Sequence, residues 1–225
     1  MQLTWLGAAG FKVDTSEGAT FLIDPFFSRP PEATPPLPIN LSDLGPVDEI
    51  LLTHGRFDHA MDTPALVEHT GAIVHAHPSV CNHLKHIGIS DHNLEPTVLN
   101  KTKRIGSLIW QPLAGAISQA DSSHTLRALL NQTQLLSDMH QLDHRWPLQG
   151  IVSYSFKADG IMMAHFGSAG WVDSVVNNLR LDIALLPVER PSHISTAVIN
   201  LAKRLRPKVI IPHHWDSYYP QIGRA

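Results

Sequence analysis

Runs of hydrophobic residues that alternate with polar ones open the chain and return in its second half. Leu3 and Trp5 alternate with polar neighbours, and two further hydrophobic runs follow at 11–13 and 20–23. A period of two, broken by turn residues, predicts an antiparallel β-meander. Later runs predict further strands at 50–52, 72–76, 94–113 (with a polar turn at 101–104), 151–156, 161–166, 183–187 and 209–211.

Hydrophobic residues at helical spacing predict helices between these later strands. Pro64 stands at the first position of one helix, with Asp62 or Thr63 as its cap, and that helix runs to about residue 69. A second helix begins near Pro78. Two more helices are predicted at 171–178 and 196–205.

Two segments interrupt this pattern. Six prolines lie between residues 30 and 46, so this stretch is predicted to be a semi-rigid loop. The polar segment 118–149 carries leucines close to helical spacing and predicts an amphipathic helical insertion. The sequence leaves open whether this insertion packs on the body, forms a lid or makes a dimer contact.

Strands and helices together indicate the fold class. Two strand-rich halves, each closed by helices, fit an α/β (α+β) sandwich of two sheets with helices outside. The length of 225 residues, with 43% hydrophobic content, favours one globular domain over residues 1–225.

Composition and charge narrow the classes of function. The net charge of −3, with basic residues scattered along the chain, gives no footprint for nucleic acid. No run approaches the roughly 18 apolar residues of a membrane span, and the N-terminus has no signal-peptide pattern. The single cysteine, Cys81, excludes an internal disulfide. A cytoplasmic protein is therefore expected.

The segment 50–62, I-L-L-T-H-G-R-F-D-H-A-M-D, carries the strongest chemical signal. His54, Asp58 and His59 lie between the end of a buried strand and the start of a helix, where a rigid scaffold can aim several side chains at one point. Two imidazoles and a carboxylate are suited to zinc, manganese or iron. His75 and His77, two residues apart, are a weaker candidate for a separate metal pair.

A second signal lies near the end of the chain, in the segment I-I-P-H-H-W-D at 210–216. Neighbouring residues of a strand face opposite ways, so only one of His213 and His214 can point into a given site.

The segment 50–62 resembles the H-x-H-x-D-H signature of the metallo-β-lactamase fold superfamily, with Arg56 at the position of the second histidine. The resemblance implies a four-layer αββα sandwich. It also places the Asp24-Pro25 pair beneath the metal loop (residues 53–59), although a turn cap is an equal alternative for Asp24. Guanidinium has no free lone pair, so Arg56 cannot be a metal ligand.

The second segment resembles the closing Pro-x-His-aromatic segment of the branch that includes ascorbate-phosphate lactonase and N-acyl-phosphatidylethanolamine phospholipase D. This match selects His214 as a ligand. Two other family ligands have no counterpart: 113–118 lacks the middle histidine, and Ser168 stands where the bridging aspartate is expected.

The resemblance assigns Asp58, His59 and His214 to the second metal position of the family and His54 to the first. It therefore implies one divalent metal, zinc with manganese or iron as alternatives, rather than two. Arg56 places a fixed positive charge where the first metal would sit, so it can orient an anionic group of the substrate or pair with Asp58 or Asp24.

Two functional hypotheses follow. The first is a single-metal hydrolase of a small, anionic ester, lactone, amide or phosphodiester-like molecule, with metal ligands His54, Asp58, His59 and His214, and with Asp58, Arg56 and His193 as catalytic or substrate-orienting residues. The second is a non-catalytic descendant that binds a ligand or partner and holds no stoichiometric metal. Association into a homo-oligomer is compatible with both.

Overall fold

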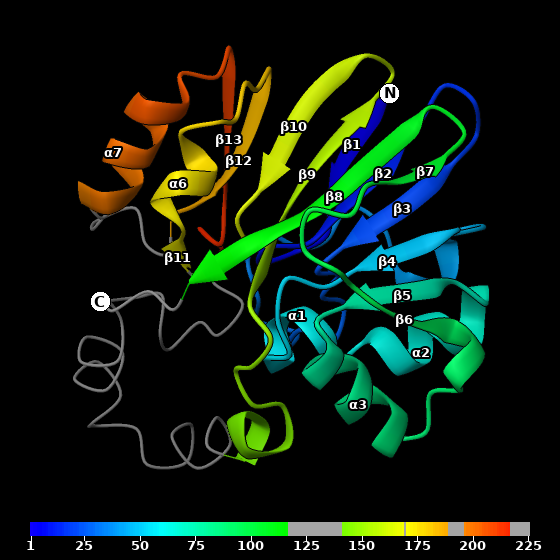
Figure 1. The fold of residues 1–225 in the computed structure, drawn as a ribbon. Helices are drawn as coiled ribbons and strands as arrows, with labels where there is room; N and C mark the ends of the chain where they lie inside the picture. Colours follow the sequence, from blue (N-terminus) through cyan, green and yellow to red (C-terminus); the bar gives the residue numbers. More distant parts are fainter. Residues whose placement is uncertain (117–140, 169, 189–195, 217–225) are drawn as a thin grey trace, which may run out of the picture.

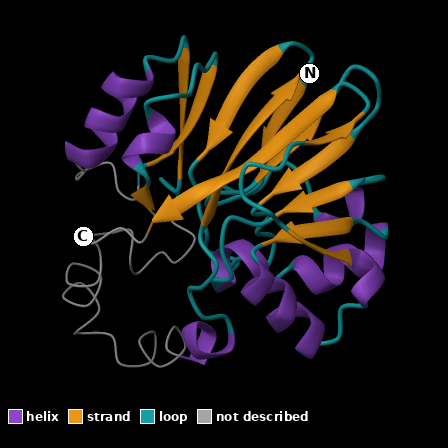
Figure 2. Cartoon of the chain, in the orientation of Figure 1, coloured by secondary structure: helices purple, strands orange, loops and turns teal. Residues whose placement is uncertain are grey.

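A computed structural model describes residues 1–116, 141–168, 170–188 and 196–216. Two β-sheets face each other in the middle of the molecule, and helices lie on the outer side of each sheet (Figures 1 and 2). This arrangement confirms the predicted αββα sandwich.

The first sheet contains six strands in chain order: β1 (Gln2–Trp5), β2 (Phe11–Asp14), β3 (Thr20–Ile23), β4 (Glu49–Leu51), β5 (Ile73–Ala76) and β6 (Leu94–Pro96). The first three strands pair antiparallel, as the alternating pattern predicts. From β3 to β6 every pairing is parallel. The carboxyl ends of β3 and β4 therefore meet at one edge.

The second sheet is built in the same mixed way from β7 (Lys103–Ile105), β8 (Leu108–Ala116), β9 (Val152–Ala158), β10 (Ile161–His165), β11 (Gly170–Trp171), β12 (Ile183–Pro187) and β13 (Val209–His213). Its order is β11-β8-β9-β10-β12-β13, with β7 paired to β8. The strands β10, β12 and β13 run parallel, so their carboxyl ends also share one edge.

The described helices that cover the first sheet are α1 (Phe57–Ala60), α2 (Thr63–Thr70) and α3 (Pro78–His86). Those that cover the far side of the second sheet are α6 (Asp173–Val176) and α7 (Thr196–Leu205). Short 3-10 turns occur at Leu41–Asp43 and Asp91–Asn93. No described helix is both long enough and apolar enough to pass through a membrane.

Three groups of buried hydrophobic residues hold these layers together. The central group fills the space between the two sheets, where Phe21 of β3 meets Phe156 of β9 edge to face, with ring centroids 5.3 Å apart. One outer group joins the first sheet to α1, α2 and α3, and the other joins the second sheet to α6 and α7. Burial of both faces of each sheet explains the continuous apolar strands such as β12.

Most predicted elements agree with the structure, and the disagreements are local. The predicted turn at 101–104 is wrong, because β7 begins at Lys103 and the hairpin turns at Gly106, which has a φ of +54°. The predicted helix 171–178 is shorter, since Gly170–Trp171 pairs with β8 as β11. The predicted insertion 118–149 lies largely outside the described residues. In its described part, residues 141–145 are helical.

His165, at the end of β10, is a buried histidine fixed in its neutral form. Its Nε2 lies 2.8 Å from the carbonyl oxygen of Ala9 and donates to it, while its Nδ1 accepts the backbone N–H of Gly167. Burial lowers the pKa of His165 from 6.5 to about 4, although the nearby Asp24 opposes that shift.

We expect the free energy of unfolding to fall as the pH is lowered from 6.5 to about 4. In that window the unfolded chain binds a proton at His165 that the folded chain does not, which costs up to about 1.4 kcal/mol per pH unit. Urea denaturation in the presence of a chelator measures this slope. His165→Gln is expected to have a shallower slope, whereas the exposed control His92→Gln keeps that of the wild type; equal slopes in all three proteins would contradict the prediction.

Candidate metal centre

The candidate site lies where the carboxyl ends of parallel strands from both sheets come together. Asp24 follows β3, His54 follows β4, Ser168 follows β10 and His214 follows β13. Side chains placed just after parallel strands share one edge of a sheet, which is where α/β proteins build their sites. Residues more than one hundred positions apart therefore meet here.

Three buried side chains form the only metal-ligating group found among the described residues: Asp58, His59 and His214. Asp58 and His59 are presented by the single turn of α1, and His214 by the chain just beyond β13. One ligand atom from each lies within 4.8 Å of the other two. His214 Nε2 is 3.3 Å from His59 Nε2 and 3.4 Å from Asp58 Oδ2, and the third separation is 3.8 Å.

These separations fit a tetrahedral cation. Ligand atoms about 2.0–2.1 Å from zinc, at the tetrahedral angle, stand roughly 3.3 Å from each other. The three measured separations, 3.3, 3.4 and 3.8 Å, are at or slightly above that value. Two imidazole nitrogens and one carboxylate oxygen are also a chemically suitable donor set.

Asp24 orients His59 from behind. The Asp24 carboxylate lies 2.8 Å from His59 Nδ1 and accepts the N–H and the hydroxyl of Thr53 at 2.7 and 2.5 Å. An acceptor on Nδ1 places the ring hydrogen there and leaves the Nε2 lone pair facing Asp58 and His214. Asp24 therefore lies beneath the metal loop, and the alternative of a simple turn cap does not describe it.

The chain that follows β10 packs against Thr53. Gly167, with a φ of +62°, approaches Thr53 so closely that a Cβ atom added to the glycine would lie 2.6 Å from Thr53 Oγ1. Only glycine fits this contact without a shift of the backbone. The second sheet is thereby held directly against the metal loop.

Burial and neighbouring charges set the protonation of the ligands. Burial lowers the pKa of His59 from 6.5 to about 3, so this ligand is neutral at physiological pH. Burial alone would raise the pKa of Asp58, but Arg56 and the two histidine ligands together hold it well below its ordinary value. A neutral imidazole and an ionised carboxylate are the forms that bind metal.

Arg56 lies at the edge of the cluster and pairs with Asp58. Its Nε is 3.6 Å from Asp58 Oδ1 and 3.4 Å from Asp143 Oδ1, and its guanidinium carbon lies 5.3 Å from the Phe57 ring centroid. The two oxygens of Asp58 thus face different partners, since Oδ2 faces the histidines. Arg56 therefore contacts Oδ1 and does not block Oδ2, the oxygen that faces the candidate metal position.

His54 and Ser168 form the adjacent half of the site. His54 Nε2 lies 2.9 Å from Ser168 Oγ, which is in turn 3.2 Å from His59 Nε2. The rings of His54 and His59 are only 3.8 Å apart between centroids. His54 therefore lies next to the three-residue group but directs its Nε2 at a hydroxyl.

His213 and His214 have different partners, because His213 ends β13 and His214 follows it with a φ of +61°. The His214 ring faces His59, whereas the His213 ring stacks on His165 at 4.6 Å between centroids, with an angle of 6° between the planes. Both His213 and His165 are fully buried and lie behind the ligands as packing groups.

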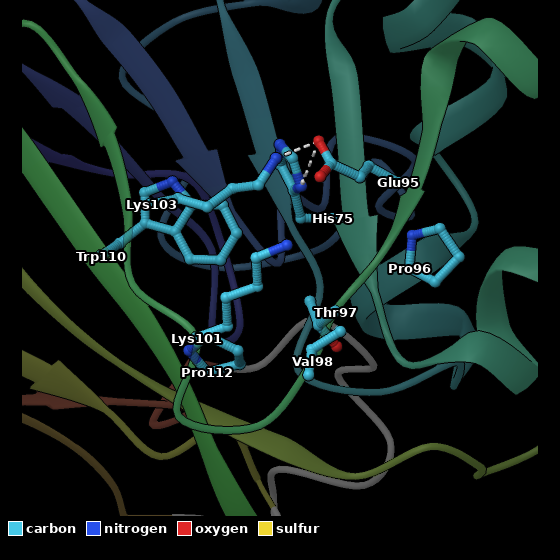
Figure 3. A pocket seen from close by; sticks show the side chains of 9 residues that line it. All are labelled: His75, Glu95, Pro96, Thr97, Val98, Lys101, Lys103, Trp110 and Pro112. Carbon is cyan, nitrogen blue, oxygen red and sulfur yellow. Dashed lines mark hydrogen bonds and ion pairs between the residues drawn. The ribbon is translucent and has the colours of Figure 1, made fainter.

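A second polar cluster lies between β5, β6 and β8 and lines a small cavity of about 20 Å³ (Figure 3). His75 has Glu49 Oε1 3.0 Å from its Nε2 and Glu95 Oε2 3.8 Å from its Nδ1. The two carboxylates therefore approach opposite sides of the ring and cannot converge on one ion. His77 lies outside β5 and caps α3, so the strand that would place His75 and His77 on one face ends before His77.

The structure brings most of the predicted site residues together. His54, Arg56, Asp58, His59 and His214 lie in one region, whereas His193 lies outside the described residues. Sequence reasoning did not single out Thr53, whose hydrogen bonds connect Asp24 to the loop. The signal that could have indicated Thr53 is its position, since it is a small hydroxyl residue between the buried strand 50–52 and the candidate ligand His54.

Curated proteins resemble the chain over nearly its whole length. A "UPF0173 metal-dependent hydrolase" of Polynucleobacter asymbioticus is 24% identical over 221 residues, covering 96% of this chain and 74% of the relative. One of Rubrobacter xylanophilus is 27% identical over 225 residues, covering 96% and 82%.

A solved structure shares the fold, and a family model identifies the family. The metallo hydrolase Igni18 of Ignicoccus hospitalis shares the fold with a TM-score of 0.69 at 19% identity, covering 99% of this chain and 85% of the other. A family model described as a beta-lactamase superfamily domain matches residues 2–214. With this match and with the sandwich and loop described above, the chain belongs to the metallo-β-lactamase superfamily.

Proposed function

We propose that this protein is a metal-dependent hydrolase that uses one divalent cation held by Asp58, His59 and His214. The observation that carries the proposal is the convergence of three buried ligand atoms, with separations of 3.3, 3.4 and 3.8 Å, in front of a histidine oriented by Asp24. Membership of the superfamily and its metal-dependent relatives support the same reading. The donor set suits zinc, with manganese or iron as alternatives.

The proposed substrate is a small ester, lactone, amide or phosphodiester-like molecule. When bound, a cation of this kind polarises the group under attack and makes water acidic enough to act at neutral pH. Asp58 supplies negative charge, and Asp24 fixes the ring of His59. Arg56, half-exposed at the edge of the cluster, is proposed to orient an anionic group of the substrate, and His193 remains a proposed substrate-side residue.

One contact favours a second candidate, a non-catalytic descendant that binds a ligand. The ion pair of Arg56 with Asp58 Oδ1 supplies the buried carboxylate with a positive partner from the protein itself. A protein of that kind is expected to be purified without stoichiometric metal.

The metal content of protein purified without chelator separates the two candidates. About one equivalent of metal is expected in the wild type, with loss from His59→Ala and His214→Ala because each variant removes one of three ligands. Mass spectrometry of the metal measures the content. The exposed controls His86→Ala and His92→Ala should keep it; metal retained in both ligand variants would exclude the proposed ligand set.

Asp24→Asn is expected to weaken metal binding by about 10–100-fold without removing a ligand, because the partner that orients His59 is lost. Competition with a chromogenic chelator measures the affinity. Thr53→Val, which removes only the hydroxyl contact to Asp24, should give a smaller loss. Asp91→Asn, in an exposed ion pair with Lys85, is the matched control; equal affinity in Asp24→Asn and this control would contradict the assigned role.

Arg56→Gln is expected to raise KM for an anionic ester by about 10-fold, the effect of one lost charge-assisted hydrogen bond. A neutral ester with the same leaving group should show little change. Steady-state kinetics on the pair of substrates measures the difference. A similar rise in KM for both esters would mean that Arg56 acts through Asp58 rather than on the substrate.

A further inference from the structure

A short segment after β3, residues 26–29, contacts both halves of the candidate metal centre. Near the first sheet, the ring of Phe26 meets the ring of Phe57 in α1 at 6.3 Å between centroids. Asp62, just beyond α1, accepts two backbone N–H groups of the segment at 2.6 and 2.9 Å. It also accepts the hydroxyl of Ser28. This end of the segment is thereby fixed to the turn that presents two of the proposed ligands.

The other end of the segment reaches the chain that follows β13. Arg29 Nη2 lies 2.9 Å from Asp216 Oδ2, and the two side chains are only 4% and 0% exposed. The guanidinium also donates from Nη1 to the carbonyl oxygen of Pro35 at 3.0 Å, and its carbon lies 5.4 Å from the ring centroid of Trp5. Because a guanidinium has a rigid, planar set of donors, several such contacts fix the position of the carboxylate it faces.

Three consecutive residues after β13 are tied to the turn between β1 and β2. The N–H of His214 donates to the carbonyl oxygen of Ala8 at 2.8 Å, and the N–H of Ala8 donates to Asp216 Oδ2 at 3.2 Å. The ring of Trp215 stacks on that of Trp5 at 5.3 Å between centroids, with 19° between the planes. These contacts hold His214 at a φ of +61°, a left-handed conformation that is uncommon outside glycine. The neighbours of His214 therefore set the direction of its ring.

We propose that the ion pair of Arg29 with Asp216 is a positioning element for the metal, because it sets the place of His214 relative to the ligands on α1. The inference rests on the proposed metal ligands. His59 and His214 are 155 positions apart in the sequence, whereas residues 26–29 connect the chain beyond α1 directly to the chain beyond β13. Groups that orient ligands without touching the metal typically change its affinity by about 10–100-fold.

An ion pair that only stabilises the fold is the alternative, and it makes a different prediction. Removal of one partner from any buried ion pair lowers the stability of the fold. Only a positioning pair also changes the affinity of folded protein for metal and the set of ligands that the metal keeps. Affinity, stability and coordination are therefore measured on the same variants of the full chain.

Arg29→Met is expected to weaken zinc binding by about 10-fold, because His214 is no longer held in place. Competition with a chromogenic chelator measures the affinity, on protein shown to be folded by circular dichroism. Asp216→Asn should give a similar loss. The double variant should lose no more than either single one, because both substitutions break the same contact. Arg29→Lys, which keeps the charge, should recover part of the affinity.

Two controls separate positioning from stability. Arg204→Met breaks an exposed ion pair with Asp173, and Leu84→Ala opens a cavity under α3. Both should keep the wild-type affinity for zinc, although Leu84→Ala should unfold at a lower urea concentration. Ser28→Ala keeps the test decisive if Arg29→Met does not fold. It removes one hydroxyl at the opposite end of the segment, on an exposed residue, and should lower the affinity by about 3-fold.

The visible spectrum of bound cobalt(II) provides a second measurement, because it depends on the number and geometry of the ligands. At saturating cobalt(II), the spectrum of Arg29→Met should move toward that of His214→Ala, as expected when His214 leaves the metal. Leu84→Ala should keep the wild-type spectrum, since a loss of stability alone does not change the ligand set.

Wild-type zinc affinity in Ser28→Ala and in each folded variant of the ion pair would overturn this inference and leave the metal-dependent function standing. An equal loss of affinity in Leu84→Ala would also overturn it, because stability alone would then explain the effect. A wild-type protein that binds neither zinc nor cobalt(II) would overturn the proposed function and this inference together.

Discussion

A fully buried carboxylate in the first sheet is the interaction on which the site depends. Asp24 follows β3, and its two oxygens accept from the N–H and hydroxyl of Thr53 and from Nδ1 of His59. Burial raises the pKa of Asp24, while the hydrogen bonds from Thr53 and the nearby rings of His165 and His54 oppose that effect. A charge in such a place is retained only with several donors around it. The same group thus fixes the metal loop, one ligand ring and the neighbouring strand end.

Much of the fold was predictable because local pattern and tertiary burial agree. The antiparallel start, the buried strand Ile183–Pro187 and the helix Thr196–Leu205 follow from periodicity alone. The exceptions are places where pairing overrides local signals. Gly170–Trp171 joins β8 as an edge strand, and Lys103 begins β7 despite its polar neighbours. Both segments pair with β8, and neither pairing is visible from the local sequence.

The site was partly predictable for a similar reason. Asp58 and His59 are adjacent in one loop. His214 was selected over His213 from the sequence, but a φ of +61° just beyond β13, rather than strand alternation, turns its ring toward His59. The contact of Ser168 with His54 and His59 depends instead on the carboxyl ends of β4 and β10 coming together from two facing sheets. No spacing in the sequence encodes a distance across 114 residues, so this half of the site required the fold.

The candidate ligands come from distant parts of the chain: His59 from α1 beside the first sheet, and His214 from just beyond β13 in the second. An ion held between them would be a cross-link between the two sheets. Its free concentration in the surrounding solution then becomes a variable of the folding equilibrium, because only the assembled halves can bind it. The end of β13 would then be held by two contacts: a bond from His214 to the ion, and the stacking of His213 on His165.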